Sequence, residues 1–478
     1  MVIAKTQYSL RNAESYFEEH LCVGDYYDQG KRVTGEWVGE AAKRLGLGED
    51  VLAQDFTRLC NNQHPATGQT LTVRLKSTRI DGDQVKANRR IFFDFTISPP
   101  KSVSIAALLG DDTRVEAAHR QAVRLAVAEL EPFAATRVRL AGNCDHRITG
   151  NFAAALFTHD TSRALDPHLH THCIVFNATH DSKENRWKAL ENQDLLRARR
   201  YVESVYYHEL TRELNALGYQ TQSRLRGDFE IVGIPEEMCT RFSKRHDQID
   251  RALDALLQER PDLKNANLND LRELLAVKGR QRKNPKLSRK ELRTLWESQT
   301  TAAEREHIRQ LAKPDQKPER RPSDERVLHE AVQWAEAHLF DRHSVLPEFQ
   351  IWQEALGRLH GQKVPASDLR RITATRGYIR SENRPYDVTL RQALAQESEI
   401  VQIAKDGRGE FEALIPNPQP LPRELDDEQK LALGRLLGSA NLVTLFRGGA
   451  GTGKSFVLRR LVEAVQQTGL SVVILAPQ

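Results

Sequence analysis

Two neighbouring runs of residues constrain the fold of this chain most strongly. Residues 151–158 are largely apolar and lead to His159, and after a polar connection at residues 160–167 a second run carries His170 and His172. Side chains two residues apart in a strand point to the same side, so His170 and His172 share one face. When the two runs pair as adjacent strands, His159 comes close to both. The pattern therefore predicts three imidazoles that converge on one face of a sheet.

Three converging imidazoles form a site for one divalent ion, with coordination positions left for substrate oxygens. An isolated His-x-His pair is more often a solvated strand, but a third histidine behind the connection favours the metal. His168 falls on the same face and follows Pro167 at the strand entrance, so we interpret it as spare or substrate-facing. Imidazole suits zinc or manganese, whereas magnesium prefers oxygen ligands. The expected ion is magnesium or manganese in the cell, with zinc as an alternative.

The gross composition describes a soluble globular protein. The chain has 478 residues, of which 39% are hydrophobic and 28% charged, and this length indicates two to four domains. No apolar run approaches the ~20 residues of a membrane span, and the first ten residues lack the apolar core of a signal peptide. Five scattered cysteines form no C-x-x-C pair, which is typical of reduced thiols. We therefore expect a cytoplasmic protein without membrane insertion.

Proline-rich stretches predict the domain boundaries. Residues 312–322 form a charged linker without periodicity, and residues 416–422 form a second, shorter break. Within the first segment, alternation over residues 91–97 predicts a strand that places Asp94 on the face opposite Phe93 and Phe95. Residues 113–131 and 195–217 are predicted to be helices.

A phosphate-binding loop is predicted near the end of the chain. Residues 448–455 match G-x-x-x-x-G-K-[ST], between a predicted strand at 442–446 and a predicted helix at 456–468, and a second strand is predicted at 471–478. Backbone N–H groups of such a loop cradle phosphate, the lysine reaches the β- and γ-phosphates and the serine can hold Mg²⁺. The predicted ATP-binding residues are Gly448, Gly449, Gly451, Gly453, Lys454 and Ser455.

No acidic Walker B strand follows this loop in the sequence. Phosphoryl transfer in this class of fold needs an acid that holds the metal. We therefore expect weak ATP/Mg²⁺ binding at most, no helicase activity, and a chain cut off inside a motor domain.

Three tyrosines near the start of the chain are candidate nucleophiles: Tyr16, Tyr26 and Tyr27. A phenol can attack phosphorus and form an ester that conserves the bond energy, but its pKa of about 10 means that a metal or base must assist. A tyrosine pair is more often a packing element, and only the histidine site favours the nucleophile interpretation. Residues 278–293 carry eight Lys or Arg and one acid, Glu291, which predicts a strip that binds a phosphodiester backbone.

These motifs, in this order, resemble the MobF class of conjugative relaxases, the bifunctional relaxase–helicases of plasmid transfer. The resemblance rests on Tyr16 with residues 25–27, on residues 93–104 and 159–172, on residues 242–245, on the basic run ending at Trp296, and on the helicase-type P-loop. It implies an α+β fold: an HUH-endonuclease palm (an antiparallel sheet with flanking helices), then a helical linker region and the start of an α/β P-loop helicase domain. The implied domains are a relaxase at 1–311, a linker at 312–322, a small helical or mixed domain at 323–415, and an incomplete helicase domain at 416–478.

The resemblance also implies roles for single residues. Tyr16 corresponds to the first catalytic tyrosine, and Tyr26 or Tyr27 to the second. Asp94 corresponds to a carboxylate that either orients a ligand histidine or accepts the tyrosine proton. One departure is that Phe17, not a second tyrosine, follows Tyr16. The implied metal ligands are His159, His170 and His172, and the expected DNA-binding residues are Lys101, Arg163, Arg280, Arg282 and Lys283.

The resemblance implies strand-specific nicking of single-stranded or supercoiled plasmid DNA at an origin of transfer. The metal-dependent transesterification leaves a 5′-phosphotyrosine adduct, and the expected partners are relaxosome accessory proteins and a type IV secretion coupling protein. The alternatives are a P-loop ATPase with a DNA-binding module, an inactive relaxase fragment, and a histidine-triad nucleotide hydrolase. Polar Thr171 and the separate His159 argue against the last of these, and that family is far shorter.

Overall fold

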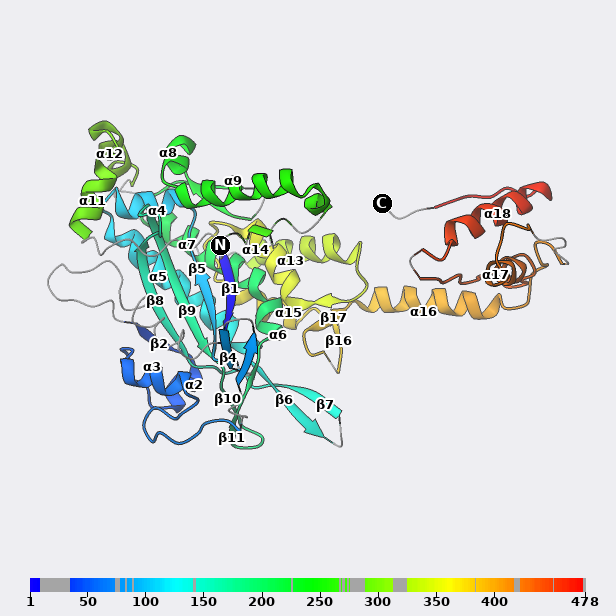
Figure 1. The fold of residues 1–478 in the computed structure, drawn as a ribbon, viewed down its shortest axis with the longest axis horizontal. Helices are drawn as coiled ribbons and strands as arrows, with labels where there is room; N and C mark the ends of the chain where they lie inside the picture. The colour runs from blue at the N-terminus through cyan, green and yellow to red at the C-terminus, as the bar shows by residue number, and fades with distance from the viewer. Residues whose placement is uncertain are drawn as a thin grey trace. The chain divides into compact units, whose positions relative to one another are not determined.

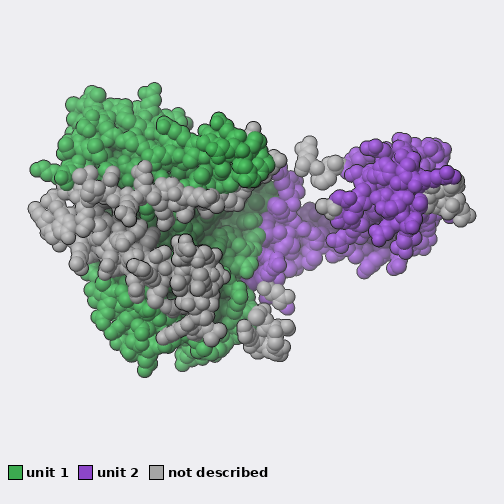
Figure 2. Space-filling view, viewed as in Figure 1, with its two compact units in different colours: residues 1–339, 347–376 green, residues 340–346, 377–478 purple. Residues whose placement is uncertain are grey.

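The computed structural model describes residues 1–8, 35–73, 78–81, 84–87, 90–140, 143–224, 227–265, 268, 271–272, 275, 289–312, 325–382, 384–416, 422–449 and 451–475. The chain forms two compact units (Figure 2). Unit 1 comprises residues 1–339 and 347–376, and unit 2 comprises residues 340–346 and 377–478. None of the described helices is both long and apolar enough to cross a membrane.

A five-stranded sheet forms the centre of unit 1 (Figure 1). Every neighbouring pair of strands is antiparallel. This confirms the antiparallel sheet with flanking helices that the sequence predicted. The strands, in spatial order, are β1 (Val2–Gln7), β5 (Phe92–Ile97), β9 (Pro167–Phe176), β8 (Ala154–Thr161) and β2 (Glu36–Val38).

Both faces of this sheet are covered by helices. On one face, Phe56 of α3 (Ala53–Cys60) makes edge-to-face contacts with Phe92, Phe157 and Phe176 at centroid distances of 5.1–6.2 Å, each worth about 0.5–1.5 kcal/mol beyond burial. Helix α2 (Glu40–Arg44) adds Ala41 and Ala42 to this core. On the reverse face, α4 (Lys101–Leu108) and α5 (Thr113–Leu130) contact β9, and α7 (Arg199–Ala216) packs on α5.

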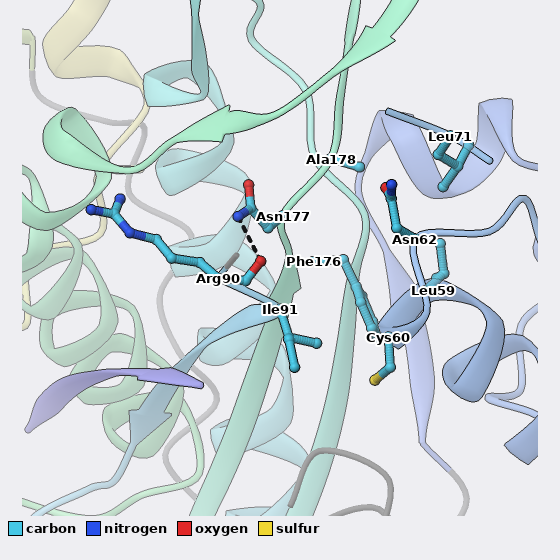
Figure 3. A pocket seen from close by; sticks show the side chains of 9 residues that line it. All are labelled: Leu59, Cys60, Asn62, Leu71, Arg90, Ile91, Phe176, Asn177 and Ala178. Atoms are coloured by element: carbon cyan, nitrogen blue, oxygen red, sulfur yellow. Dashed lines mark hydrogen bonds between the residues drawn. The ribbon is translucent and has the colours of Figure 1, made fainter. Parts of the chain in front are cut away.

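A small cavity lies beside the core on the Phe56 face (Figure 3). It offers about 10 Å³ to solvent, which is about the room that one water molecule needs. Asn177 Nδ2 donates a hydrogen bond to the Arg90 carbonyl at its wall, at 2.8 Å. None of the candidate site residues lines this cavity, which is too small for a nucleotide. Its lining residues are Leu59, Cys60, Asn62, Leu71, Arg90, Ile91, Phe176, Asn177 and Ala178.

Smaller elements complete the part of unit 1 that precedes residue 312. The predicted helix at 195–217 is two helices, because the chain turns at Ala198 between α6 (Gln193–Arg197) and α7. The additional helices are α8 (Glu236–Arg241), α9 (Lys244–Glu259), α11 (Arg289–Glu297), α12 (Ala302–Arg309) and the 3₁₀ turns η2 (Glu131–Phe133) and η3 (Pro261–Asn265). The additional strands are β3 (Thr78–Asp81), β4 (Gln84–Ala87), β6 (Ala135–Leu140), β7 (Asn143–Ile148), β10 (Thr179–Asp181), β11 (Arg186–Lys188), β12 (Leu190–Glu191), β13 (Thr221–Ser223) and β14 (Phe229–Ile231).

The predicted separate domain at 323–415 is corrected by the structure. Residues up to 376 belong mostly to unit 1, because α14 (Glu348–Leu359) packs on α7. His208 Nε2 of α7 donates to the Val364 carbonyl at 2.7 Å, and the Ala366 N–H donates to Glu209 at 3.1 Å. The proline-rich segment thus joins two parts of one unit. The other helices here are α13 (Glu325–Phe340) and α15 (Asp368–Ala374).

Unit 2 contains the predicted P-loop region but not its predicted strands. Residues 442–446 and 471–475 form no ladder with any described strand, and Leu445 and Ile474 are 85% and 76% exposed. Buried parallel strands need neighbours on both edges and helices on both faces, and the described residues of unit 2 supply no such neighbours. The unit contains α16 (Arg391–Asp406), α17 (Asp427–Leu437), α18 (Lys454–Gln467) and the short strands β16 (Ile379–Arg380) and β17 (Asp387–Thr389). The boundary between the units falls within β15 (Leu346–Pro347).

Candidate active site

The strand register brings the predicted histidines together. His159 of β8 lies directly opposite His170 of β9, and Phe157 lies opposite His172. On the other side of β9, Thr96 of β5 pairs with His172. Along β9 the same face then carries Ile174 and Phe176, which belong to the apolar core. One face of the central sheet is therefore apolar at one end and rich in imidazole at the other.

The three imidazole rings are evenly spaced. Ring centroids are 5.3 Å apart for His159 and His170, 5.5 Å for His159 and His172, and 5.2 Å for His170 and His172. Three imidazoles bound to one ion through bonds of about 2.1 Å have centroids about 5 Å apart. In their present rotamers, no three His, Cys, Asp or Glu side chains among the described residues are close enough to hold an ion.

Asp94 orients the ring of His172. His172 Nδ1 lies 3.0 Å from both carboxylate oxygens of Asp94 and 3.2 Å from Thr96 Oγ1. The Asp94 residue is only 5% exposed. A carboxylate that accepts the Nδ1 proton leaves Nε2 as the coordinating nitrogen and fixes the ring. This geometry favours the orienting role over the proton-accepting role. Thr96 was missed from the sequence, although it stands two residues after Asp94 on the same face.

A backbone carbonyl orients the ring of His170. His170 Nδ1 lies 2.9 Å from the carbonyl oxygen of His168, so it donates there and leaves Nε2 for an ion. The imidazole rings of His168 and His170 are stacked, with their centroids 4.7 Å apart. His168 was interpreted from the sequence as spare or substrate-facing. In the structure its backbone carbonyl contacts the predicted ligand His170, and the interpretation of its side chain stays a prediction.

Helices from far along the chain hold the turn between the two histidine strands. Asp166, 1% exposed, accepts from the Lys244 N–H at 3.0 Å and pairs with Lys244 Nζ at 3.3 Å. Burial raises the pKa of Asp166 and the Lys244 charge opposes that shift. Trp296 Nε1 donates to the Leu165 carbonyl at 2.7 Å, where Leu165 has a φ of +61°. Two stretches that carried the family resemblance thus secure a strained turn.

The predicted DNA-binding residues differ in where the structure places them. Lys101 is not an exposed cation: its Nζ donates to the Pro167 carbonyl at 3.0 Å, and burial lowers its pKa. Its predicted contact with the DNA backbone stays a prediction. Arg163 is half-buried in the β8–β9 turn. Outside the described residues lie Arg280, Arg282 and Lys283, as do the three candidate nucleophiles Tyr16, Tyr26 and Tyr27.

The P-loop glycines precede α18, which begins at Lys454. Gly451 and Gly453 have φ of +78° and +76°, which side chains rarely adopt. A Cβ on Gly448 would lie 2.7 Å from Thr452 Oγ1, so a larger residue there would force the Thr452 side chain to shift. Lys454 Nζ donates to the Gly448 carbonyl at 2.7 Å and to that of Gly449. The lysine is folded onto its own loop, next to Ser455 in the first turn of α18.

Comparison with known proteins agrees with this arrangement. The family model described as TrwC relaxase matches residues 10–303, and that described as AAA domain matches residues 424–478. The multifunctional conjugation protein TraI of Escherichia coli is 39% identical over 249 residues, which is 49% of this chain and 13% of TraI. TraI of Escherichia coli strain K12 is 37% identical over 265 residues, 52% of this chain and 14% of that protein. The chain thus spans about one seventh of the length of these curated relatives.

Solved structures of the conjugative relaxase TrwC with oriT DNA are also similar. A metal-bound complex superposes with a TM-score of 0.52 at 30% identity, covering 64% of this chain and 98% of that one. A copper-bound complex gives 0.53 at 30% identity with the same coverage. A complex with a 27-mer comprising the recognition hairpin and the cleavage site gives 0.51 at 29% identity, again covering 64% and 98%. With a family model that matches well over half of its residues, the chain belongs to the TrwC relaxase family of conjugative relaxases, the MobF class that its motifs resemble.

Proposed function

We propose that this chain nicks one strand of plasmid DNA at an origin of transfer by transesterification through Tyr16. The observation that carries the proposal is the imidazole-rich face of the central sheet, where His172 is oriented by Asp94 and His170 by a backbone carbonyl. Both rings use Nδ1 for these hydrogen bonds, so Nε2 is the nitrogen that would bind an ion. A chance cluster of histidines has no need for this common orientation. The relatives support the substrate, because the TrwC structures are complexes with oriT DNA.

The three histidines fit a divalent ion chemically. Neutral imidazole nitrogens bind manganese and zinc well, and three ligands leave positions open for substrate oxygens. We propose magnesium or manganese as the cellular ion, with zinc as an alternative. When bound, such an ion neutralises charge on the scissile phosphate and sets its orientation for in-line attack.

The remaining steps belong to the residues of the chain. The Tyr16 phenolic oxygen forms a new bond to phosphorus while the bond between phosphorus and the 3′ oxygen breaks. The 3′ oxygen leaves as a free hydroxyl after taking up a proton, and the tyrosine proton passes to a base. The ester keeps the energy of the broken bond, so attack by a 3′-hydroxyl reverses the reaction. Tyr26 or Tyr27 is proposed as a second nucleophile for a later strand transfer.

Other parts of the proposal concern the cellular setting. We infer that relaxosome accessory proteins and a type IV secretion coupling protein act with this chain, because the similar TraI proteins are conjugation proteins. The thiols of Cys173 and Cys239 form no disulfide, which supports a reducing cytoplasm. The P-loop is proposed to bind ATP weakly, because its glycine conformations favour a phosphate cradle.

The test is covalent capture of DNA. Single-stranded fragments that tile plasmid transfer origins are labelled at the 3′ end and incubated with the full chain and Mn²⁺. We expect a labelled protein–DNA adduct on a denaturing gel, lost in Tyr16→Phe, in His172→Ala and with chelator.

The position of the label and the affinity for DNA complete this test. A 5′-labelled fragment should not label the protein, because the 5′ side leaves as a free 3′-hydroxyl. His172→Ala should still bind single-stranded DNA, since backbone affinity is spread over many contacts. Cleavage that persists in Tyr16→Phe without an adduct would overturn the proposal.

A further inference from the structure

The segment Ser98–Ser104 has no role in the proposed reaction so far. Pro99 and Pro100 end β5 and lead into α4, so the pairing of β5 with β9 stops at Ile97 and Thr171. The next residues of β9, from Pro167 to Leu169, extend beyond the last residue of β5. Their backbone groups on that side therefore need partners from another element.

Side chains of α4 take the place of the missing strand. Lys101 and Ser104 are three residues apart and share one face of the helix. Lys101 Nζ donates to the Pro167 carbonyl at 3.0 Å, and the Leu169 N–H donates to Ser104 Oγ at 3.1 Å. Ser104 and Leu169 are 0% and 1% exposed. The two contacts hold the backbone on either side of His168.

One peptide plane links Ser104 to the predicted ligand His170. The N–H of Leu169 and the carbonyl of His168 belong to the same peptide bond, which is planar. Its N–H donates to Ser104, and its carbonyl accepts from His170 Nδ1 at 2.9 Å. The orientation of this plane therefore determines where His170 Nε2 points.

We infer that Lys101 and Ser104 are positioning residues for the metal site: they hold the peptide planes at residues 167–168 and 168–169 and thereby aim His170 at the ion. This rests on the proposed metal-dependent function. In this role Lys101 supports ion binding indirectly, by holding the backbone of β9. It would then not be one of the DNA contacts that the sequence predicted. The hydroxyl of Ser104 acts in series with Lys101, one peptide further along β9.

Ser102 offers a matched control within the same helix. Its hydroxyl is also buried, but it accepts from the Ile231 N–H at 2.9 Å and bonds to Glu230, at β14. Removing this hydroxyl costs a buried hydrogen bond just as Ser104→Ala does, without touching the histidine strand.

The experiment measures Mn²⁺ binding by calorimetry on the full chain without DNA. We expect the Kd for Mn²⁺ to rise about 10- to 100-fold in Ser104→Ala and Lys101→Met, as for other groups that orient metal ligands. Ser102→Ala should keep the wild-type Kd despite a comparable fall in melting temperature. The visible absorption of bound Co²⁺ should change in the first two variants alone. Single-stranded DNA binding in chelator should stay within about twofold for all three.

Distinct outcomes separate this inference from the proposed function. Wild-type Mn²⁺ affinity in both Ser104→Ala and Lys101→Met would overturn the inference and leave the nickase proposal intact. An unchanged Mn²⁺ Kd with weaker DNA binding in Lys101→Met, and a salt slope reduced by about one, would return Lys101 to the DNA contacts. Failure of the wild-type chain to bind Mn²⁺ would instead remove the proposed metal site. Should Ser104→Ala not fold, Lys101→Met decides alone, because its side chain is only half-buried.

Discussion

At the scale of single residues, the hydrogen bonds that the imidazole Nδ1–H groups donate determine how the site is arranged. His172 Nδ1 donates a hydrogen bond to the Asp94 carboxylate, and His170 Nδ1 donates one to the His168 carbonyl. On the reverse face of β9, buried His119 bonds Thr171 at 2.9 Å and Tyr206 at 2.7 Å. Thr171 lies between the two predicted ligands in the sequence. The histidine strand is thus held by polar contacts on both of its faces.

The Asp94→Asn variant distinguishes the two roles that the sequence allowed for this carboxylate. We expect the Mn²⁺ Kd to rise about 10- to 100-fold, because a neutral amide holds the His172 tautomer less firmly than a carboxylate does. Nicking should recover at high Mn²⁺ concentration. The check is a nicking rate measured against Mn²⁺ concentration. An unchanged Mn²⁺ requirement with a rate that stays low would show that Asp94 accepts the tyrosine proton instead.

Among the elements, α14 packs on α7 and α15 bonds to α5, so residues far along the chain cover the helices of the central sheet. Arg370 of α15 pairs with Glu129 at 2.8 Å and lies 4.6 Å from the centre of the Trp352 ring. Tyr201 of α7 donates to the same Glu129 at 2.6 Å. His208 adds a buried contact to Val364. These groups are desolvated together. Removing residues 352–370 would therefore leave several buried polar groups of α5 and α7 without partners.

Truncation tests the extent of unit 1. A fragment ending at residue 376 should melt like unit 1 of the full chain and nick at its rate. A fragment ending at 311 keeps every residue predicted for the nicking site, so it should still nick at low temperature. It should nevertheless be less stable by several kcal/mol, because His208, Glu209 and Tyr201 lose their cover. Thermal melts and nicking at two temperatures check this. Equal melting of the two fragments would contradict the docking argument.

His208 should make unfolding depend on pH. Burial lowers its pKa to about 4, against about 6.5 in the unfolded chain. The unfolded state therefore takes up the proton first, so stability is fully present above about pH 6.5 and is lost as the pH falls towards 4. Between pH 7.5 and 5.0 this one histidine should cost about 2 kcal/mol. His360, with its pKa lowered to about 4, and His119, to about 3, act in the same direction.

Urea unfolding at pH 7.5 and pH 5.0 checks the contribution of His208. His208→Gln keeps a donor for the Val364 carbonyl but cannot be protonated, so it should lose about 2 kcal/mol less than the wild-type chain between the two pH values. A wild-type pH dependence in the variant would show that other groups cause the acid sensitivity.

At the scale of the whole molecule, the P-loop lies in unit 2, directly before α18. Between Ser455 and the last residue the sequence has one acidic residue, Glu463. Its carboxylate pairs with Arg460 on the same helix at 2.7 Å. Helices α17 and α18 pack together through a small core that includes Leu433, Leu437 and Val457. Among the described residues that follow the loop, the one carboxylate is thus paired within its own helix.

We expect no DNA-stimulated ATP hydrolysis and no unwinding from this 478-residue chain. Hydrolysis needs an acid that positions Mg²⁺ and a group that orients the attacking water. The measurement is phosphate release with and without single-stranded DNA, compared with Lys454→Ala. A robust rate that disappears in the variant would contradict this expectation and mean that another chain supplies the missing groups.

Local periodicity carried most of what the sequence determined. The two-residue repeat placed His170 and His172 on one face and Asp94 opposite Phe93, and the glycine pattern predicted the P-loop. These inferences depend on residues within a few positions of each other, where backbone geometry leaves few choices.

Partners distant in the sequence were decided only by the tertiary structure. Distant segments decide the register that sets His159 opposite His170. They also decide the bond of Lys101, at the start of α4, to the Pro167 carbonyl and the place of most of residues 325–376 in unit 1. The apolar runs at 442–446 and 471–475 are predicted strands that do not form in the structure. Their composition favours strands, but a strand exists only when another segment accepts its hydrogen bonds. Side-chain direction is therefore a local property of the sequence, whereas the partner of each backbone or side-chain group is a property of the fold.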